Sequence, residues 1–164
     1  MSAVVKKSSR KIGKGIAGIS SLLPGPNGVK VGFPAGGDEK ELQKAIWNEF
    51  GTRGGASGGG WGGPIPERPF MRNAMRDNRS DYNMQLIKGA GFLIREAIKG
   101  NGIAAAKRNV LGKLGIRARG DIQDEIVALS SPPNSPLTIE LKGSDSPLID
   151  TGMMKSSVRW EIDE

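Results

Sequence analysis

A glycine-rich run followed by three closely spaced prolines constrains this chain more than any other stretch. Seven of the ten residues from Gly54 to Gly63 are glycine, and Pro64, Pro66 and Pro69 follow directly. The glycines predict a flexible loop, and a proline fits the first turn of a helix, where its missing N–H has no partner to lose. One element should therefore end before the loop, and a helix should begin near Pro69. Trp61 within the loop indicates that the loop docks against another surface.

The apolar content is low for a chain of 164 residues. Hydrophobic residues make up 37% and aromatic residues 5%, and there are 25 glycines. Such a chain can bury only a modest core to offset the conformational entropy lost on ordering its backbone. We therefore expect one domain whose longer segments are ordered by their neighbours, which suits a self-assembling protein better than a compact enzyme.

The chain contains neither cysteine nor histidine. This excludes disulfides, thiol nucleophiles, the usual zinc ligands and the imidazole general base. The most closely spaced acids, Asp121, Asp124 and Glu125, could serve a carboxylate-based hydrolase, but we interpret them as the N-cap and first-turn acids of a helix. We predict no catalytic residue, no metal site and no cofactor, and the chain is not expected to be an enzyme.

The charge is distributed unevenly. The net charge is +7, and three of the last four residues, Glu161 to Glu164, are acidic. The first 30 residues carry no acid and include the candidate DNA-facing residues Lys6, Lys7, Arg10, Lys11 and Lys14. A basic arm of this kind binds nucleic acid, binds an acidic protein surface or stays solvated, and opposite charges at the two ends suit contacts between subunits.

No apolar run approaches the roughly eighteen residues that a membrane-spanning helix requires. The start of the chain is basic, but it lacks a clear cleavage site and is not interpreted as a signal peptide. We expect no membrane contact, and we expect the protein to remain in the cytoplasm of the cell that makes it.

The first part of the chain predicts an arm, a strand and a helix. Residues 1–28 form the basic arm, with a weak helix in which Ile12, Ile16, Ile19 and Leu23 share one face. Residues 29–33 alternate apolar and polar, which predicts a half-buried strand. Asp38 is a suitable N-cap for a helix over residues 39–50, and Gly51 is a suitable stop.

The longest helical pattern runs from about residue 70 to residue 99, with two apolar rows, one of which contains Ile87, Ile94 and Ile98. A basic ridge lies near its start. The ridge consists of Arg68, Arg72, Arg76 and Arg79. These side chains could meet phosphates, so a DNA-binding module that uses the arm and the ridge is the alternative function.

The rest of the chain completes a single α+β domain over residues 29–164. The patterns predict a short helix or loop over 103–115, a helix over 121–129 and a strand over 138–142. A short helix near 153–156 precedes a closing strand over 157–162, which we expect to pair with the strand at 29–33. The predicted fold is thus a small antiparallel sheet packed with one long helix and several shorter ones.

Separated segments of the chain resemble a known family. Residues 48–52 (NEFGT) and 65–72 (IPERPFMR) are similar to the NEFGT … IPxRPFhR signature of tailed-bacteriophage tail-completion proteins, the neck proteins of virion morphogenesis. Residues 147–158 (PLIDTGMMKSSV) look like the PLhDTGxLxxSh ending of that family, and residues 132–139 (PPNSPLTI) resemble its proline-rich link. The order and spacing agree over about residues 29–163. The long glycine-rich insertion and the basic arm lie outside the shared pattern.

The resemblance implies a virion protein whose α+β subunits form a ring, usually six-fold, between the phage head connector and the tail tube or at the head-proximal end of that tube. The expected partners are further copies of the chain, the head-completion or connector protein and the tail-terminator or tail-tube protein. A ring in the neck would also make non-specific contact with the genomic DNA in its lumen.

Several matched residues and their neighbours are candidates for these assembly contacts. They are Trp61, Arg68, Phe70, Arg72, Arg76, Asp150 and Trp160. Phe70 is expected to anchor the long helix, and Arg68 and Arg72 to pair with acids of the same or a neighbouring subunit. Asp150 and Thr151 are expected to cap the short helix that follows them.

Overall fold

The chain folds into an elongated α+β structure built along one long helix. The computed structural model describes residues 24–34, 36–53 and 64–163, and the predicted arm helix and Trp61 lie outside these ranges. The elements in chain order are β1 (Gly28–Gly32), α2 (Glu39–Phe50), α3 (Phe70–Asp77), α4 (Arg79–Ile98), α5 (Ile103–Ala128), α6 (Pro136–Lys142), α7 (Met153–Ser157) and β2 (Arg159–Asp163). The predicted α+β class is confirmed.

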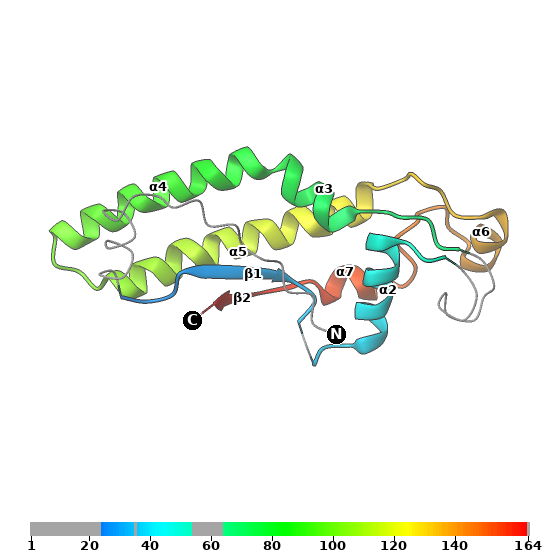
Figure 1. Ribbon diagram of the computed structural model, residues 1–164, viewed down its shortest axis with the longest axis horizontal. Coiled ribbons are helices and arrows are strands. Elements are labelled where there is room, and N and C mark those ends of the chain that lie inside the picture. The colour runs from blue at the N-terminus through cyan, green and yellow to red at the C-terminus, as the bar shows by residue number, and fades with distance from the viewer. Residues whose placement is uncertain (1–23, 35, 54–63, 164) are drawn as a thin grey trace.

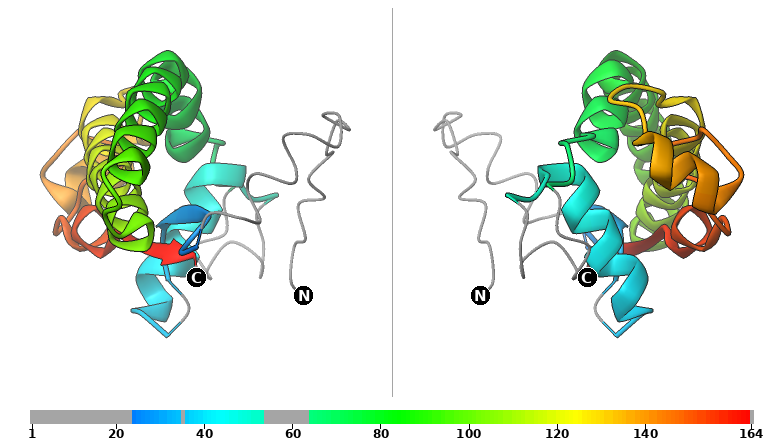
Figure 2. Two further views of the ribbon diagram at one scale, coloured as in Figure 1. Left: turned by 90° about the vertical axis from the view of Figure 1, so that its left-hand side faces the viewer. Right: turned by 90° about the vertical axis from the view of Figure 1, so that its right-hand side faces the viewer.

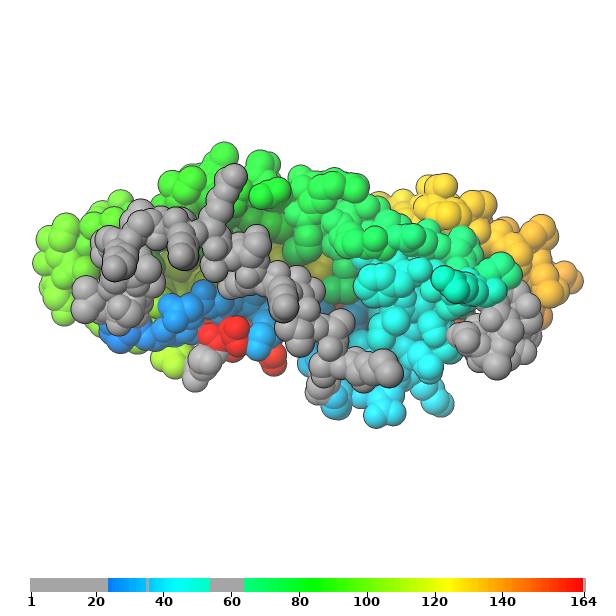
Figure 3. All heavy atoms as spheres, viewed as in Figure 1, coloured from blue at the N-terminus to red at the C-terminus, as the bar shows by residue number. Residues whose placement is uncertain are grey.

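Helix α5 lies between two layers. Helix α4 runs antiparallel to it on one side, and the β1–β2 ribbon lies on the other, as Figures 1 and 2 show. Helices α2, α6 and α7 gather at the end of the molecule opposite the α4–α5 turn, and α2 projects from the body there (Figure 3). We call this end the α2–α6 end.

The prediction for the region of α5 is wrong, because the region is one helix and not a short helix or loop followed by a second helix. Glycines at 112, 115 and 120 favoured an interruption on propensity alone. In the structure Gly112 and Gly115 are the places where the indole of Trp160 packs, and a Cβ on Gly115 would lie 2.7 Å from the Trp160 ring. Tertiary packing therefore overrides the local preference.

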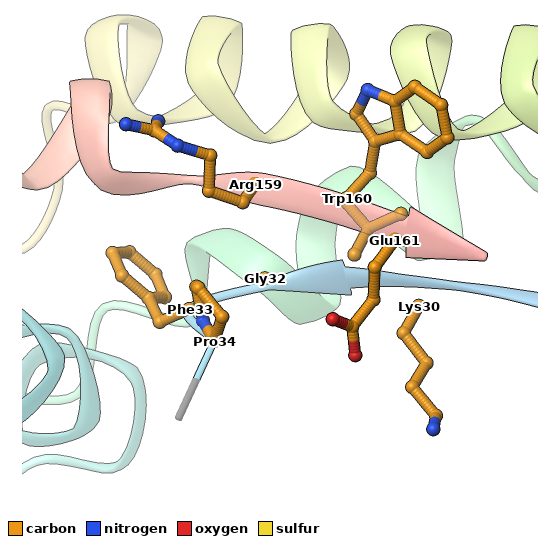
Figure 4. Close-up of a pocket in the computed structure, with 8 residues that line it drawn as sticks. Lys30, Gly32, Phe33, Pro34, Arg159, Trp160 and Glu161 are labelled. Carbon is orange, nitrogen blue, oxygen red and sulfur yellow. The ribbon is translucent and has the colours of Figure 1, made fainter. Parts of the chain in front are cut away.

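The predicted pairing of the first and last strands is confirmed. β1 and β2 are antiparallel, and the partners include Val29 with Ile162, Lys30 with Glu161 and Val31 with Trp160. Figure 4 shows Trp160 pointing toward α5, whereas Lys30 and Glu161 point away from it. The hollow of about 440 Å³ on this sheet, also drawn in Figure 4, is therefore bordered by charged side chains.

The long helix predicted over 70–99 is divided at Asn78 into α3 and α4. Asn78 adopts φ −96° and ψ 8°, and its Nδ2 donates to the carbonyl of Ala74 (3.0 Å). Asparagine competes with the helical ladder through such local bonds, which explains why the helix axis changes here.

The strand predicted over 138–142 is also wrong, because these residues form helix α6. Ser135 caps this helix by accepting from the Thr138 N–H (3.2 Å), Pro136 occupies its first turn and Gly143 ends it in a left-handed conformation. The sheet consequently has two strands and not three within the described residues.

The predictions for α2 and α7 are confirmed in extent. The Asp38 carboxylate accepts from the Lys40 N–H (2.9 Å), and Gly51 ends α2 at φ +69°. The core joins these helices to α3, α5 and Val158, the residue that precedes β2. Its buried hydrophobic residues are Ala45, Phe70, Ala74, Ile122, Ile126, Leu129, Leu148, Met154 and Val158. None of the helices in the described ranges combines the length and apolar character needed to cross a bilayer.

Candidate assembly site

The side chain of Arg68 connects three segments that are distant in sequence. Its Nη1 donates to Oδ1 of Asn48 (3.0 Å), its Nε to the carbonyl of Pro132 (2.8 Å) and its Nη2 to the carbonyl of Pro133 (2.9 Å). The residue is only 5% exposed, and burial lowers the pKa of its guanidinium. The expectation that Arg68 pairs with an acid is wrong within this subunit, because its partners here are neutral oxygens that stabilise the cation by hydrogen bonds.

Glu49 of α2 connects two helices, because its side chain caps the N-terminus of α3. Its carboxylate accepts from the backbone N–H groups of Met71 (2.9 Å) and Arg72 (3.1 Å). Pro69 at the N-cap of α3 provides no side-chain acceptor, so the unpaired N–H groups of the first turn are satisfied by Glu49 instead. Glu49 is 4% exposed and is therefore a buried carboxylate with defined partners.

The guanidinium of Arg72 lies beside the capping carboxylate of Glu49 and contacts it directly. Its Nε donates to Glu49 (2.9 Å), its Nη2 donates to Glu67, and its central carbon lies 5.3 Å from the centre of the Phe50 ring. The hydrogen bonds that its guanidinium donates to Glu49 and then to Glu67 raise the pKa of Arg72. The expectation that Arg72 pairs with acids is confirmed within the same subunit.

The two halves of the NEFGT and IPERPFMR signature are joined at the base of the glycine-rich segment. The N–H of Thr52 donates to the carbonyl of Ile65 (2.9 Å), and the N–H of Ile65 donates to the Thr52 hydroxyl (3.0 Å). Gly51 is pressed against this join, since a Cβ there would lie 3.0 Å from the Ile65 carbonyl oxygen. The two residues that flank this segment, Thr52 and Ile65, are therefore fixed side by side.

The later motifs meet at the same place. Asn134 accepts from Arg68 (3.4 Å) and donates to the carbonyl of Ser146 (3.3 Å), directly before the PLIDTG segment. Within that segment Leu148 is buried in the core, and Met154 is buried where α7 packs against α2. All the segments that carry the resemblance thus form one physical unit.

This end of the molecule also exposes apolar surface. A groove of about 540 Å³ runs between α2 and α3. Its apolar lining comprises Phe33, Leu42, Ala45, Ile46, Phe50, Met71 and Met75. Phe50 is 65% exposed, and on α6 Leu137 and Leu141 are 63% and 68% exposed. Methionines along a groove can adapt to the shape of a partner.

Some predicted assembly residues are used inside the subunit. Phe70 is fully buried and meets Phe33 edge-to-face, with ring centres 6.3 Å apart, so its expected anchoring role is confirmed. Arg68 is buried as well, and Trp160 packs against α5. None of these three offers a partner a broad surface in this structure.

Asp150 is exposed, but the expectation that it caps α7 is wrong. The N-cap position belongs to Gly152, whose φ of +76° favours glycine because glycine has no Cβ to clash with the backbone in this conformation. Thr151 supplies only a long contact, 3.4 Å from its hydroxyl to the N–H of Met153.

The basic ridge is not continuous in the structure. Arg68 is inside the protein, Arg72 pairs with two glutamates, and exposed Arg76 bonds to Asp77 (2.9 Å) and Asn73 (2.9 Å). Lys6, Lys7, Arg10, Lys11 and Lys14 lie outside the described residues. Within residues 24–34, 36–53 and 64–163, no group of three acidic side chains is placed to hold a metal ion.

Sequence reasoning missed the roles of Glu49 and Asn134. A signal existed for Glu49, because a helix that begins after Pro69 has no capping side chain of its own and requires an acceptor from elsewhere. No local signal existed for Asn134, whose partners lie 66 residues earlier and 12 residues later in the chain.

No protein-family model, curated protein or solved structure matches this chain. The functional argument therefore depends on the geometry of the subunit and on the motifs that this geometry brings together.

Proposed function

We propose that this protein is a structural subunit of a tailed-bacteriophage virion, which forms a ring in the neck or head-proximal tail and joins the tail to the head connector. The observation that carries the proposal is the convergence on Arg68. Its guanidinium bonds to Asn48 of the first motif and to Pro132, Pro133 and Asn134 of the link. Unrelated matches would have no reason to share one hydrogen-bonded centre.

The exposed apolar side chains at the α2–α6 end support an assembly role. Phe50, Leu137 and Leu141 are each more than 60% exposed, next to a subunit core that is small. Side chains of this kind are common where protein surfaces associate, since burying them removes apolar area from water. A neighbouring subunit or ring would bury them.

The arrangement suits a ring more than a two-fold dimer. The α2–α3 groove and the leucines of α6 are different surfaces, and a contact between two different surfaces is heterologous. Heterologous contacts repeat head to tail and close into rings when the rotation allows it. Thr52 and Ile65, the residues on either side of the glycine-rich segment, are held together at this same end.

The direct test is negative-stain electron microscopy and analytical ultracentrifugation of the purified protein, alone and mixed with the head-connector and tail-tube proteins of its phage. We expect closed rings, with a six-fold class, in at least one mixture. Deletion of the gene should yield unjoined heads and tails, and the wild-type gene should restore joining. A protein that remains monomeric in every mixture and is dispensable for joining would refute the proposal.

A further inference from the structure

The end of the molecule formed by the turn between α4 and α5 is strongly basic. Between Asp81 and Asp121 the chain carries eight lysines and arginines and a single acid, Glu96. The rest of the described chain is acidic on balance, with 15 acids against 11 basic residues. The basic part lies opposite the α2–α6 end (Figure 1). Charge is therefore separated along the molecule, and a polyanion would be attracted to one end of it.

Part of this charge lies in one line along α4. Lys88, Phe92, Arg95 and Lys99 follow spacings of four, three and four, which place them on the same side of the helix. All four residues are exposed. The line spans eleven residues, about 16 Å at 1.5 Å per residue. It presents three cations and one aromatic ring to an approaching ligand.

Helix α5 supplies a second wall beside this line. A hollow of about 280 Å³ lies between the two helices. Its polar lining comprises Gln85 and Lys88 of α4 and Asn109 and Lys113 of α5. Gly89 lets the helices approach closely, because a Cβ on it would lie 2.4 Å from the side chain of Val110. The two lysines thus line one shallow hollow from two different helices.

The cations of this surface are available to a ligand. Within the described part of the chain, none of the ion pairs involves Lys88, Arg95 or Lys113. Lys99 has an acidic neighbour, with its Nζ 3.3 Å from Glu96, but the lysine side chain remains 64% exposed. Exposed pairs of this kind contribute little and are easily exchanged. We call this surface the basic hairpin face, and its members are Gln85, Lys88, Arg95, Lys99, Asn109 and Lys113.

We propose that the basic hairpin face binds the phosphate backbone of double-stranded DNA without regard to base sequence. Lysine, arginine, asparagine and glutamine are side-chain types that contact phosphate oxygens and fix a protein on a duplex. The hollow between the helices is concave and fits a projecting row of phosphates. A bilayer surface is flat on this scale, so an anionic membrane fits the hollow less well.

This assignment differs from the expectation that the arginine ridge meets phosphates. The ridge loses Arg68 to the interior and Arg72 to two glutamates, whereas the cations of the basic hairpin face are exposed. The inference does not depend on ring formation. A protein that forms rings but does not bind DNA would refute the inference and leave the proposed function standing.

Charge neutralisation in the full-length protein tests the proposal. The variant carries Lys88→Gln, Arg95→Gln and Lys113→Gln, and the probe is a fluorescein-labelled duplex of arbitrary sequence, followed by fluorescence anisotropy. At about 0.1 M salt the affinity should fall at least about tenfold. The slope of log K against log salt concentration should shrink by about 2.7, because each lost phosphate contact removes about 0.9.

The matched control carries Lys40→Gln, Arg76→Gln and Arg79→Gln. It removes the same charge at exposed positions outside the basic hairpin face and includes the exposed members of the ridge. Its affinity should fall by less than about threefold, since salt screens distant charges. Equal losses in the two variants would overturn the proposal, as would an unchanged salt slope in the hairpin variant. A hairpin variant that keeps DNA binding but loses binding to phosphatidylserine vesicles would also overturn it, in favour of a membrane surface.

Lysine footprinting locates the contact independently of any substitution. The wild-type protein is acetylated briefly with and without the duplex, and the modified lysines are quantified by mass spectrometry. DNA should protect Lys88 and Lys113 at least about fivefold, because their amines would contact phosphate oxygens. Exposed Lys40 should react equally in both samples. Equal reactivity of Lys88 and Lys113 with and without DNA would refute the proposal.

Discussion

At the scale of single residues, Arg68 is the side chain whose loss should matter most. Arg68→Met keeps much of the side-chain volume but leaves the oxygens of Asn48, Pro132 and Pro133 without their charged donor. We expect the free energy of unfolding to fall by about 3 kcal/mol, because three hydrogen bonds from a charged donor are lost. Urea denaturation followed by circular dichroism measures this change.

The matched control for that substitution is Arg76→Met, at an exposed arginine that pairs with the adjacent Asp77. Exposed pairs contribute little, so the change should stay within about 0.5 kcal/mol. Similar losses for the two variants would contradict the central role of Arg68.

Tyr82 should make the stability of the protein depend on pH in the alkaline range. Its hydroxyl donates to Asp121 (2.8 Å), and burial followed by this hydrogen bond raises its pKa above the ordinary value of about 10. The folded pKa is therefore higher than the unfolded one. The stabilising contribution is complete below about pH 10 and decreases as the pH rises through the folded pKa.

This dependence is measurable because Tyr82 is the only tyrosine in the chain. Ultraviolet titration of the folded protein should show phenolate forming at a higher pH than in urea. Tyr82→Phe should cost about 1 kcal/mol at neutral pH and flatten the alkaline part of the stability curve. Coincident titrations of folded and unfolded protein would contradict the assignment.

At the scale of elements, two glycines of α5 should respond to alanine in opposite ways. At Gly115 the new Cβ would lie 2.7 Å from the Trp160 ring and 2.8 Å from Val29, so Gly115→Ala should destabilise the protein by about 2 kcal/mol. At Gly120 an added Cβ would have no atom of another segment within 4 Å. Gly120→Ala should therefore stabilise the protein by about 0.5–1 kcal/mol through helix propensity. Thermal unfolding of both variants tests the pair, and shifts of the same sign would contradict the packing described for Trp160.

The same helix shows where sequence reasoning succeeded and where it failed. Helix α2 was predictable because its signals, Asp38 before it and Gly51 after it, are local. Helix α5 was not predictable, because Gly112 and Gly115 pack against Trp160, which is 45 residues away from Gly115 in the chain. Propensity cannot report a packing partner at that distance.

The prediction for the residues of α6 failed for a different reason. The alternation of residues 138–142 is too short to separate a strand from a helix, whereas Ser135, Pro136 and Gly143 were the informative residues. At the candidate site, the segments that carry the motifs are the ones that the structure brings together. They did not predict that Arg68 would bind backbone carbonyls, since any residue type can supply a carbonyl.

At the scale of the whole molecule, assembly should be separable from folding. Leu137 and Leu141 are exposed and lie outside the core, so Leu137→Lys with Leu141→Lys should leave the melting temperature nearly unchanged. If α6 contributes to the ring contact, the double variant should weaken assembly by about 100-fold, roughly 2.7 kcal/mol. Sedimentation over a range of protein concentrations measures this effect.

The control for the double variant is Ile116→Lys, which changes an exposed isoleucine midway along α5, away from the α2–α6 end. It should assemble as the wild type does. Unchanged assembly of the α6 double variant would place the ring contact on another surface, with the α2–α3 groove as the first to examine.

The join between Thr52 and Ile65 has a consequence for how this protein can change over time. Because both ends of the intervening segment are fixed at one point, its length can vary with little effect on the body. Doubling a closed loop costs only about 0.6 kcal/mol of closure entropy. Insertions, peptide tags or exchanged sequences should be tolerated there, so this part of the chain can evolve, or be engineered, independently of the scaffold.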